Sequence, residues 1–72
     1  MIEKAHLIKI ANTPMPFGKY KGRMLVDVPD EYLLWFAKKG FPKGELGELM
    51  ELTLALKIEG LDSVIRPLKG KA

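Results

Sequence analysis

The chain has no cysteine among its 72 residues, so packing alone must hold its fold together. A chain this short buries a small core and is marginally stable unless it packs well or self-associates. Without cysteine it can form neither disulfides nor thiolate metal sites. Hydrophobic residues make up 47% of the sequence, which suits a globular domain and is too high for a disordered segment. We therefore expect one small domain over residues 1–72.

Proline and glycine divide the sequence into short segments. Apolar spacing over 2–11 favours a helix, with a strand as the alternative, and Pro14 ends this segment. Segments 15–17 and 24–28 are expected to pair as a β-hairpin with residues 18–22 at its tip. A helix is expected to begin at Pro29 and to end at Gly40. A second helix should run from Glu45 to about Glu59, followed by one turn through Ile65.

These elements predict a small α+β domain, in which a short β-hairpin packs against about three α-helices. An isolated two-stranded hairpin is marginal in water, so the helices must cover it. The last residues, 69–72, are expected to fray.

Charge is unevenly distributed along the chain. The formal net charge is +3, with an excess of Lys and Arg in 15–43 and after 61, and an excess of Glu in 44–60. A basic face attracts polyanions whatever their sequence. The basic middle segment therefore makes nucleic acid a candidate partner.

The candidate site is the glycine-bracketed tip of the expected hairpin. It does not match a P-loop, whose glycines and lysine lead into a helix. Backbone amides freed by Gly18 and Gly22, together with nearby cations, can still hold a phosphate. In this hypothesis three cations contact phosphates, an aromatic ring stacks on a base, and further lysines extend the footprint. The phosphate-contacting cations are Lys19, Lys21 and Arg23, and the stacking ring is Tyr20. The further lysines are Lys38, Lys39 and Lys43. The alternative is a solvated turn whose lysines aid solubility.

Catalytic or metal chemistry has little support in the sequence. The one histidine, His6, lies in a hydrophobic segment, and a zinc site needs about three protein ligands. Helix capping and dipole matching explain the carboxylates Asp27, Asp30 and Glu31. We therefore expect no enzymatic activity, no cofactor, no metal and no small-molecule substrate.

The two long helices carry more apolar residues than one face needs. Tyr32, Leu33, Trp35 and Phe36 are expected mainly in the core, but Trp35 and Phe36 lie about 100° apart on a helix and need not both be buried. An exposed ring there would extend the basic face. The helix from Glu45 is leucine-rich nearly all round and needs cover on most sides. An alternative function is therefore a protein-interaction or regulatory module that forms a homodimer through this helix.

The sequence shows no apolar run of about 20 residues, the length needed to cross a bilayer. Its start, with Glu3 and a short apolar stretch, does not resemble a secretory signal. We therefore expect a cytoplasmic protein without a membrane partner.

Three motifs together resemble a known family. They are M-P-F-G-K-Y-K-G at 15–22, V-P-D-E-Y-L-L-W-F at 28–36 and K-G-F-P-K-G-E-L-G at 39–47. Over about residues 13–68 the chain resembles a small bacterial domain of unknown function labelled "putative quorum-sensing-regulated virulence factor". That label names no reaction.

A similar pattern, F-G-K-x-K-G followed by Y-L-x-W, also occurs attached to exonuclease-type domains. The resemblance implies a nucleic-acid role for the matching positions, which are Phe17, Gly18, Lys19, Tyr20, Lys21, Gly22, Tyr32 and Trp35. Because the sequence contains no nuclease domain, exonuclease activity is not implied. We expect a non-enzymatic accessory domain that binds nucleic acid or another polyanion weakly.

Overall fold

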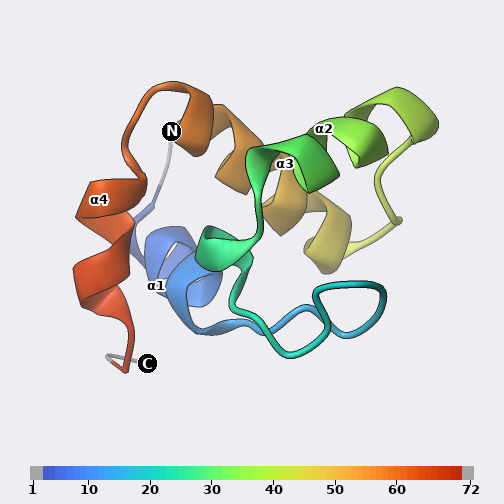
Figure 1. Ribbon diagram of the computed structural model, residues 1–72. Helices are drawn as coiled ribbons and strands as arrows, with labels where there is room; N and C mark the ends of the chain where they lie inside the picture. Colours follow the sequence, from blue (N-terminus) through green and yellow to red (C-terminus); the bar gives the residue numbers. More distant parts are fainter. Residues whose placement is uncertain (1–2, 71–72) are drawn as a thin grey trace.

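The computed structural model describes residues 3–70, which fold as a small helical domain (Figure 1). Its elements are α1 (Lys4–Asn12), the 3-10 turn η1 (Leu25–Asp27), α2 (Asp30–Lys39), α3 (Glu45–Ile58), α4 (Asp62–Ile65) and the 3-10 turn η2 (Arg66–Leu68). Helix α3 contacts α1, α2, η1 and α4, so it forms the centre of the domain. None of the described helices is long and apolar enough to cross a membrane.

The predicted β-hairpin, and with it the α+β fold class, is wrong. Residues 3–70 contain no strand, and their β-type pairing is limited to one isolated antiparallel bridge between Pro14 and Met24. Pro14 and Pro16 both lack the backbone N–H that a ladder needs. On the other side, the adjacent residues Leu25 and Val26 are both fully buried, which a strand with one solvent face does not allow. The chain turns there as η1 instead.

The predicted helices are confirmed at both ends to within a few residues. Helix α2 has Asp30 in its first turn, where acids favour the dipole, and ends at Gly40 with φ +107°. Helix α3 ends in a Schellman motif. In it Gly60 has φ +75°, its N–H bonds the Lys57 carbonyl at 3.0 Å, and the Leu61 N–H bonds the Leu56 carbonyl at 2.9 Å.

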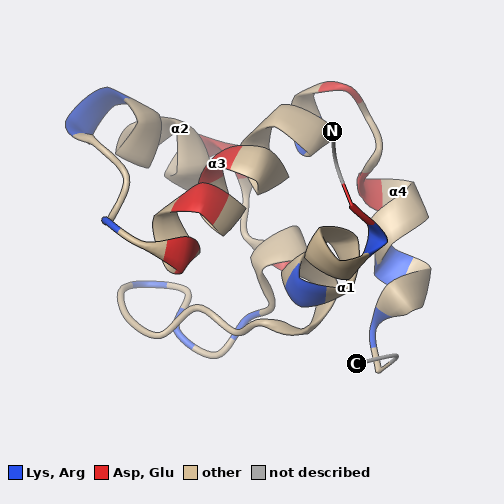
Figure 2. Ribbon diagram, turned by 180° about the vertical axis from the view of Figure 1, so that it is seen from behind, with Lys and Arg blue, Asp and Glu red and all other residues tan. Residues whose placement is uncertain are grey.

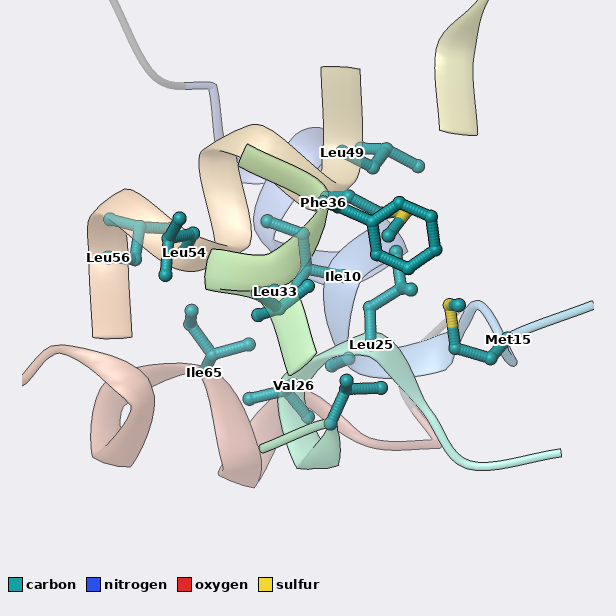
Figure 3. Close-up of a cluster of buried hydrophobic side chains, with 13 residues drawn as sticks. Ile10, Met15, Leu25, Val26, Leu33, Phe36, Leu49, Leu54, Leu56 and Ile65 are labelled. Carbon is teal, nitrogen blue, oxygen red and sulfur yellow. The ribbon is translucent and has the colours of Figure 1, made fainter. Parts of the chain in front are cut away.

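The core lies between α3 and the elements around it (Figure 3). Ile10 from α1, Leu33 from α2, and Leu25 from η1 are fully buried, and so is Met50 of α3. Among residues 3–70 the one buried polar side chain is Thr53, which donates its hydroxyl to the Leu49 carbonyl at 2.6 Å. Most of the leucine-rich surface of α3 is therefore covered from within the same chain.

The short link between α2 and α3 crosses the first turn of α3 at Gly47. A Cβ atom at this position would lie 1.7 Å from the Pro42 carbonyl oxygen. Glycine at this position carries the ordinary helix-propensity penalty, about 1 kcal/mol relative to alanine. It permits the backbone contact that brings the two helices together.

The C-terminal segment is tied back to the rest of the domain. Asp27 in η1 forms ion pairs with Arg66 and Lys69. Burial raises the pKa of the Asp27 carboxyl, but the ion pairs with Lys69 and Arg66 outweigh this and hold the pKa below its ordinary value. The Asn12 side-chain amide donates a hydrogen bond to the Leu68 carbonyl at 3.0 Å, and its oxygen accepts one from the Gly70 N–H at 2.6 Å. Residues 69–72 were predicted to fray, but Lys69 and Gly70 form the ion pair with Asp27 and the hydrogen bond with Asn12. Residues 71–72 lie outside the described residues.

Candidate functional site

The candidate site is built on the loop between α1 and η1, residues 13–24. Backbone hydrogen bonds close the base of this loop: Met15 N–H donates to the Arg23 carbonyl at 2.7 Å, and Gly22 N–H to the Met15 carbonyl at 2.9 Å. At the tip, Lys21 N–H donates to the Gly18 carbonyl at 3.2 Å. The Met15 side chain is buried and anchors the loop in the core. The loop is thus held in one shape without strands.

Gly18 lets the loop approach α2 closely. Its φ is +82°, and a Cβ atom there would lie 2.2 Å from the Tyr32 hydroxyl oxygen. Gly22 also has a positive φ, +91°, but has open space around it. The two glycines therefore differ in purpose: both permit a turn, and Gly18 also permits packing against Tyr32.

A series of edge-to-face aromatic pairs joins the loop to α2. Ring centroids are 4.9 Å apart for Tyr20 and Tyr32, 5.2 Å for Tyr32 and Phe36, and 6.2 Å for Phe17 and Phe36. Trp35 continues the series, 5.1 Å from Phe36. Such pairs stabilise by about 0.5–1.5 kcal/mol each beyond their buried area. They fix the loop cations relative to α2.

Tyr20, the predicted stacking residue, is partly covered by its neighbours. Lys19 Nζ lies 5.6 Å from its ring centroid and Arg23 Cζ lies 5.4 Å from it, both within cation–π range. The ring also packs edge-on against Tyr32. Its main contribution is therefore to gather two of the predicted cations.

Trp35 is the more accessible aromatic side chain, with 53% of its surface exposed. Helix α2 buries Leu33 and Phe36, and Trp35 lies away from the buried face they define. Sequence reasoning placed Trp35 mainly in the core. The signal of its exposure was its position next to Phe36, since rings about 100° apart on a helix need not both be buried.

Two shallow grooves border Trp35. The first, of about 350 Å³, is lined by Lys19, Tyr20, Glu31, Tyr32 and Trp35. The second, of about 280 Å³, is lined by Glu31, Leu34, Trp35 and Lys38. Trp35 and Glu31 therefore belong to both grooves, and each groove has one lysine. Sequence analysis assigned Glu31 only to the helix dipole, so its place here was missed.

Cations outside the predicted site are engaged in ion pairs. Lys9 Nζ lies 2.5 Å from Glu45 Oε2, and Lys57 Nζ lies 3.4 Å from Asp30 Oδ1. The hydrogen bond from Lys9, with its charge, lowers the pKa of Glu45. Arg66 and Lys69 are held by Asp27. Four of the five cations at residues 3–70 outside the predicted site are thus paired, the exception being Lys4.

The six predicted cations behave differently. Within the part of the chain that the structure describes, none of them has an acidic group within 4.0 Å. They are Lys19, Lys21, Arg23, Lys38, Lys39 and Lys43. All are exposed to solvent. These charges therefore remain available to an anionic partner.

Only some of the predicted cations lie at the aromatic grooves. The loop, the last turn of α2 and the 40–44 link lie at the same end of the molecule (Figure 1). The acidic first turns of α3 lie beside the link and the loop (Figure 2). Lys19 and Lys38 line the aromatic grooves and Arg23 lies against the Tyr20 ring, whereas Lys21, Lys39 and Lys43 line neither groove.

Metal chemistry has no evident site in this region. Across residues 3–70, no group of three or more His, Asp or Glu side chains is placed to hold a metal ion. The exposed His6 lines a separate groove of about 300 Å³ with Glu45 and Glu48. The chemistry of the candidate site is therefore that of cations and aromatic rings, with one carboxylate.

Comparison with known proteins identifies the family. Residues 3–68 match the family described as "Putative quorum-sensing-regulated virulence factor", and the chain belongs to it. The chain is similar to "Uncharacterized protein YpeB" of Escherichia coli strain K12 and to its counterpart in Escherichia coli O157:H7. Each is 65% identical over 69 residues, which cover 94% of this chain and 96% of the relative. No solved structure matches the chain. The resemblance seen in the sequence is thus confirmed.

Proposed function

We propose that the protein is a non-enzymatic domain that binds single-stranded nucleic acid through the loop cations and the exposed face of α2. Lys19, Lys21 and Arg23 contact phosphates, and an unpaired base stacks on Trp35. Lys38 contacts the strand on the far side of Trp35, with Lys39 and Lys43 adding long-range attraction. The proposal assigns the protein to the cytoplasm, where single strands are accessible.

The observation that carries this proposal is the contrast between paired and unpaired cations. Lys9, Lys57, Arg66 and Lys69 have acidic partners, whereas the cations around Trp35 have none among the described residues. Exposed cations beside an exposed aromatic ring are the two elements that single-strand binding needs. Phosphates would pair with the cations, and the stacked base would remove Trp35 from water.

Single strands fit the site better than duplexes for a geometric reason. Stacking on a side chain requires a base whose face is free, and bases in a duplex already stack on each other. Three or four phosphate contacts to a single strand predict a slope of log K against log salt concentration of about −2 to −3. Binding should therefore be weak at physiological salt and much tighter at low salt.

The test is fluorescence anisotropy of labelled 12-nucleotide strands and matching duplexes, measured at low and at physiological salt. We expect single strands to bind more tightly than duplexes, with the salt slope given above. Lys21→Glu should weaken binding at least tenfold at low salt. Lys4→Glu changes the net charge equally and is the matched control, because Lys4 lies at the start of α1 and has no acidic partner within 4.0 Å among residues 3–70.

Two results would count against the proposal. No binding at low salt would leave the loop lysines as a solvated turn. An equal loss from Lys4→Glu and Lys21→Glu would mean that only the overall charge matters. Circular dichroism of each variant confirms that the helices are retained, so that a loss of binding reports on the surface.

A second candidate function is self-association at the other end of α3. Three apolar side chains are exposed there: Ile58 by 66%, Val64 by 58% and Leu61 by 43%. Beside them lies a groove of about 250 Å³, lined by Leu7, Leu56, Leu61, Val64 and Ile65. This patch supports a homodimer in which only the end of the leucine-rich helix takes part.

Sedimentation velocity over a range of protein concentrations tests the homodimer. A dimer that dissociates on the change Val64→Glu would support it, since the charge would be buried in the contact. A protein that stays monomeric at high concentration would rule out this function. Because Val64 lies far from the loop in the sequence and lines neither Trp35 groove, its substitution should leave nucleic-acid binding intact.

A further inference from the structure

Glu31 is the one group around Trp35 that nucleic-acid binding alone does not explain. It lines both grooves beside the indole, together with Lys19 in one and Lys38 in the other. Among residues 3–70 it has no cationic partner within 4.0 Å. A carboxylate in this place repels phosphates and lowers affinity for any polyanion. Its place in the first turn of α2 suits the helix dipole, and its place beside Trp35 also puts it next to any base that stacks there.

We propose that Glu31 reads the edge of the base stacked on Trp35 and selects bases that carry an exocyclic amino group, cytosine above all. This inference rests on the proposed binding of single strands and names the ligand of the same site. It adds a specificity-determining residue to a surface that otherwise recognises any sequence.

The arrangement of charge around Trp35 locates the base and the backbone. Along this face the aromatic ring and the carboxylate are shared by the two grooves, whereas the lysines each belong to one groove. Phosphates are attracted to the lysines and repelled from Glu31. The backbone should therefore pass over Lys19 and Lys38, with the base turned toward Trp35 and Glu31 between them.

Glu31 and Trp35 are also suited to act on one base because of their spacing. They are four residues apart on α2, so their side chains lie on the same helix face. A base stacked on the indole would present its edge to the neighbouring carboxylate. A carboxylate only accepts hydrogen bonds, so it favours an edge that donates.

Cytosine and uracil differ most at the position that a carboxylate would read. Cytosine carries an N4 amino group, which donates to Glu or Asp in known patterns of base readout. Uracil carries a carbonyl oxygen at the same position, and its one ring N–H lies between two carbonyl oxygens that would repel the carboxylate. The two bases otherwise have similar size and stacking surface, so they isolate the contribution of Glu31.

The experiment measures the binding of labelled 12-nucleotide oligocytidylate and oligouridylate to the full chain at low salt and pH 7.5. We expect oligocytidylate to bind about 5- to 10-fold more tightly, which is the lower part of the range for one base contact. Glu31→Gln should bring the ratio close to one. It should also tighten oligouridylate binding, since the repulsive charge is removed.

Glu59→Gln is the matched control. It removes one exposed carboxylate at the end of α3, outside both Trp35 grooves. It should raise the affinity for both oligonucleotides by a similar small factor and leave their ratio unchanged. A change of ratio in this variant would mean that net charge, and not Glu31, sets the preference.

The outcomes separate this inference from the proposed function. Equal binding of both oligonucleotides by the unmodified protein would overturn the reading of the base by Glu31 and leave single-strand binding in place. A cytosine preference that survives Glu31→Gln would also overturn it. Absence of binding to either oligonucleotide would overturn the proposed function, and this inference with it.

Discussion

At the scale of single residues, Asp27 connects the centre of the chain to its C-terminal segment. It was expected near a helix cap, but its carboxylate pairs with Arg66 and Lys69, about forty residues away in sequence. Its pKa is lowered in the folded protein because these pairs outweigh the effect of burial. Ion pairs between residues so far apart cannot be predicted from the local sequence. Locally, the helix dipole is a sufficient explanation for an acidic residue just before a helix.

Asp27→Asn should lower the free energy of unfolding by about 1 kcal/mol at neutral pH, since both ion pairs are lost. A carboxyl whose pKa is depressed by folding stabilises the protein above its ordinary pKa, here 3.8, and this contribution is lost as pH falls through the folded value. The difference between the two proteins should therefore shrink as the pH falls below 3.8 and through the lowered pKa of Asp27. Urea unfolding at several pH values measures it. A difference that persists in acid would contradict the account.

Gly18 and Gly22 give a second comparison at this scale. Gly22→Ala should cost about 1–2 kcal/mol, the strain of alanine in the left-handed region. Gly18→Ala should cost about 1–3 kcal/mol more, because the new Cβ meets the Tyr32 hydroxyl. Urea unfolding of the two variants compares them directly. Equal losses of stability would mean that the loop is not packed against Tyr32.

At the scale of elements, the sequence predicts the helices well because each carries its own boundary signals. Pro14 follows α1, acids open α2 and α3, and glycines follow the ends of α2 and α3. The predicted hairpin was wrong because Val26 and Val28 have the spacing of residues on one face of a strand. In the structure these residues and Leu25 are all fully buried. Their burial results from the packing of α1 and α3 around η1 and not from the local sequence pattern.

Gly47→Ala tests how α2 and α3 are joined. At an open helical position this change would stabilise by about 1 kcal/mol. Here we expect a net loss of about 1–3 kcal/mol, because the added methyl group meets the Pro42 carbonyl and the link must shift. Thermal unfolding followed by circular dichroism gives the sign. A rise in Tm would show that the link does not cross α3 this closely.

At the scale of the whole molecule, folding sorts the charges into two sets. The sequence indicates a basic middle and an acidic helix, and it identifies the loop and α2 cations as candidates. It does not show that Lys9, Lys57, Arg66 and Lys69 are held in ion pairs, because their partners are distant in sequence. Nor does it show Trp35 and Glu31 sharing two grooves, since this depends on how the loop packs on α2.

The central claim is that a base of a single strand stacks on Trp35 while the loop cations hold its backbone. Trp35 is the only tryptophan in the chain, so tryptophan fluorescence reports on the surroundings of this residue. The most direct measurement is Trp35 emission during titration with a 12-nucleotide single strand at low salt. We predict strong quenching that is reversed by added salt and lost in Lys21→Glu. Unchanged emission at oligonucleotide concentrations that saturate anisotropy would contradict the claim, since the strand would then bind elsewhere.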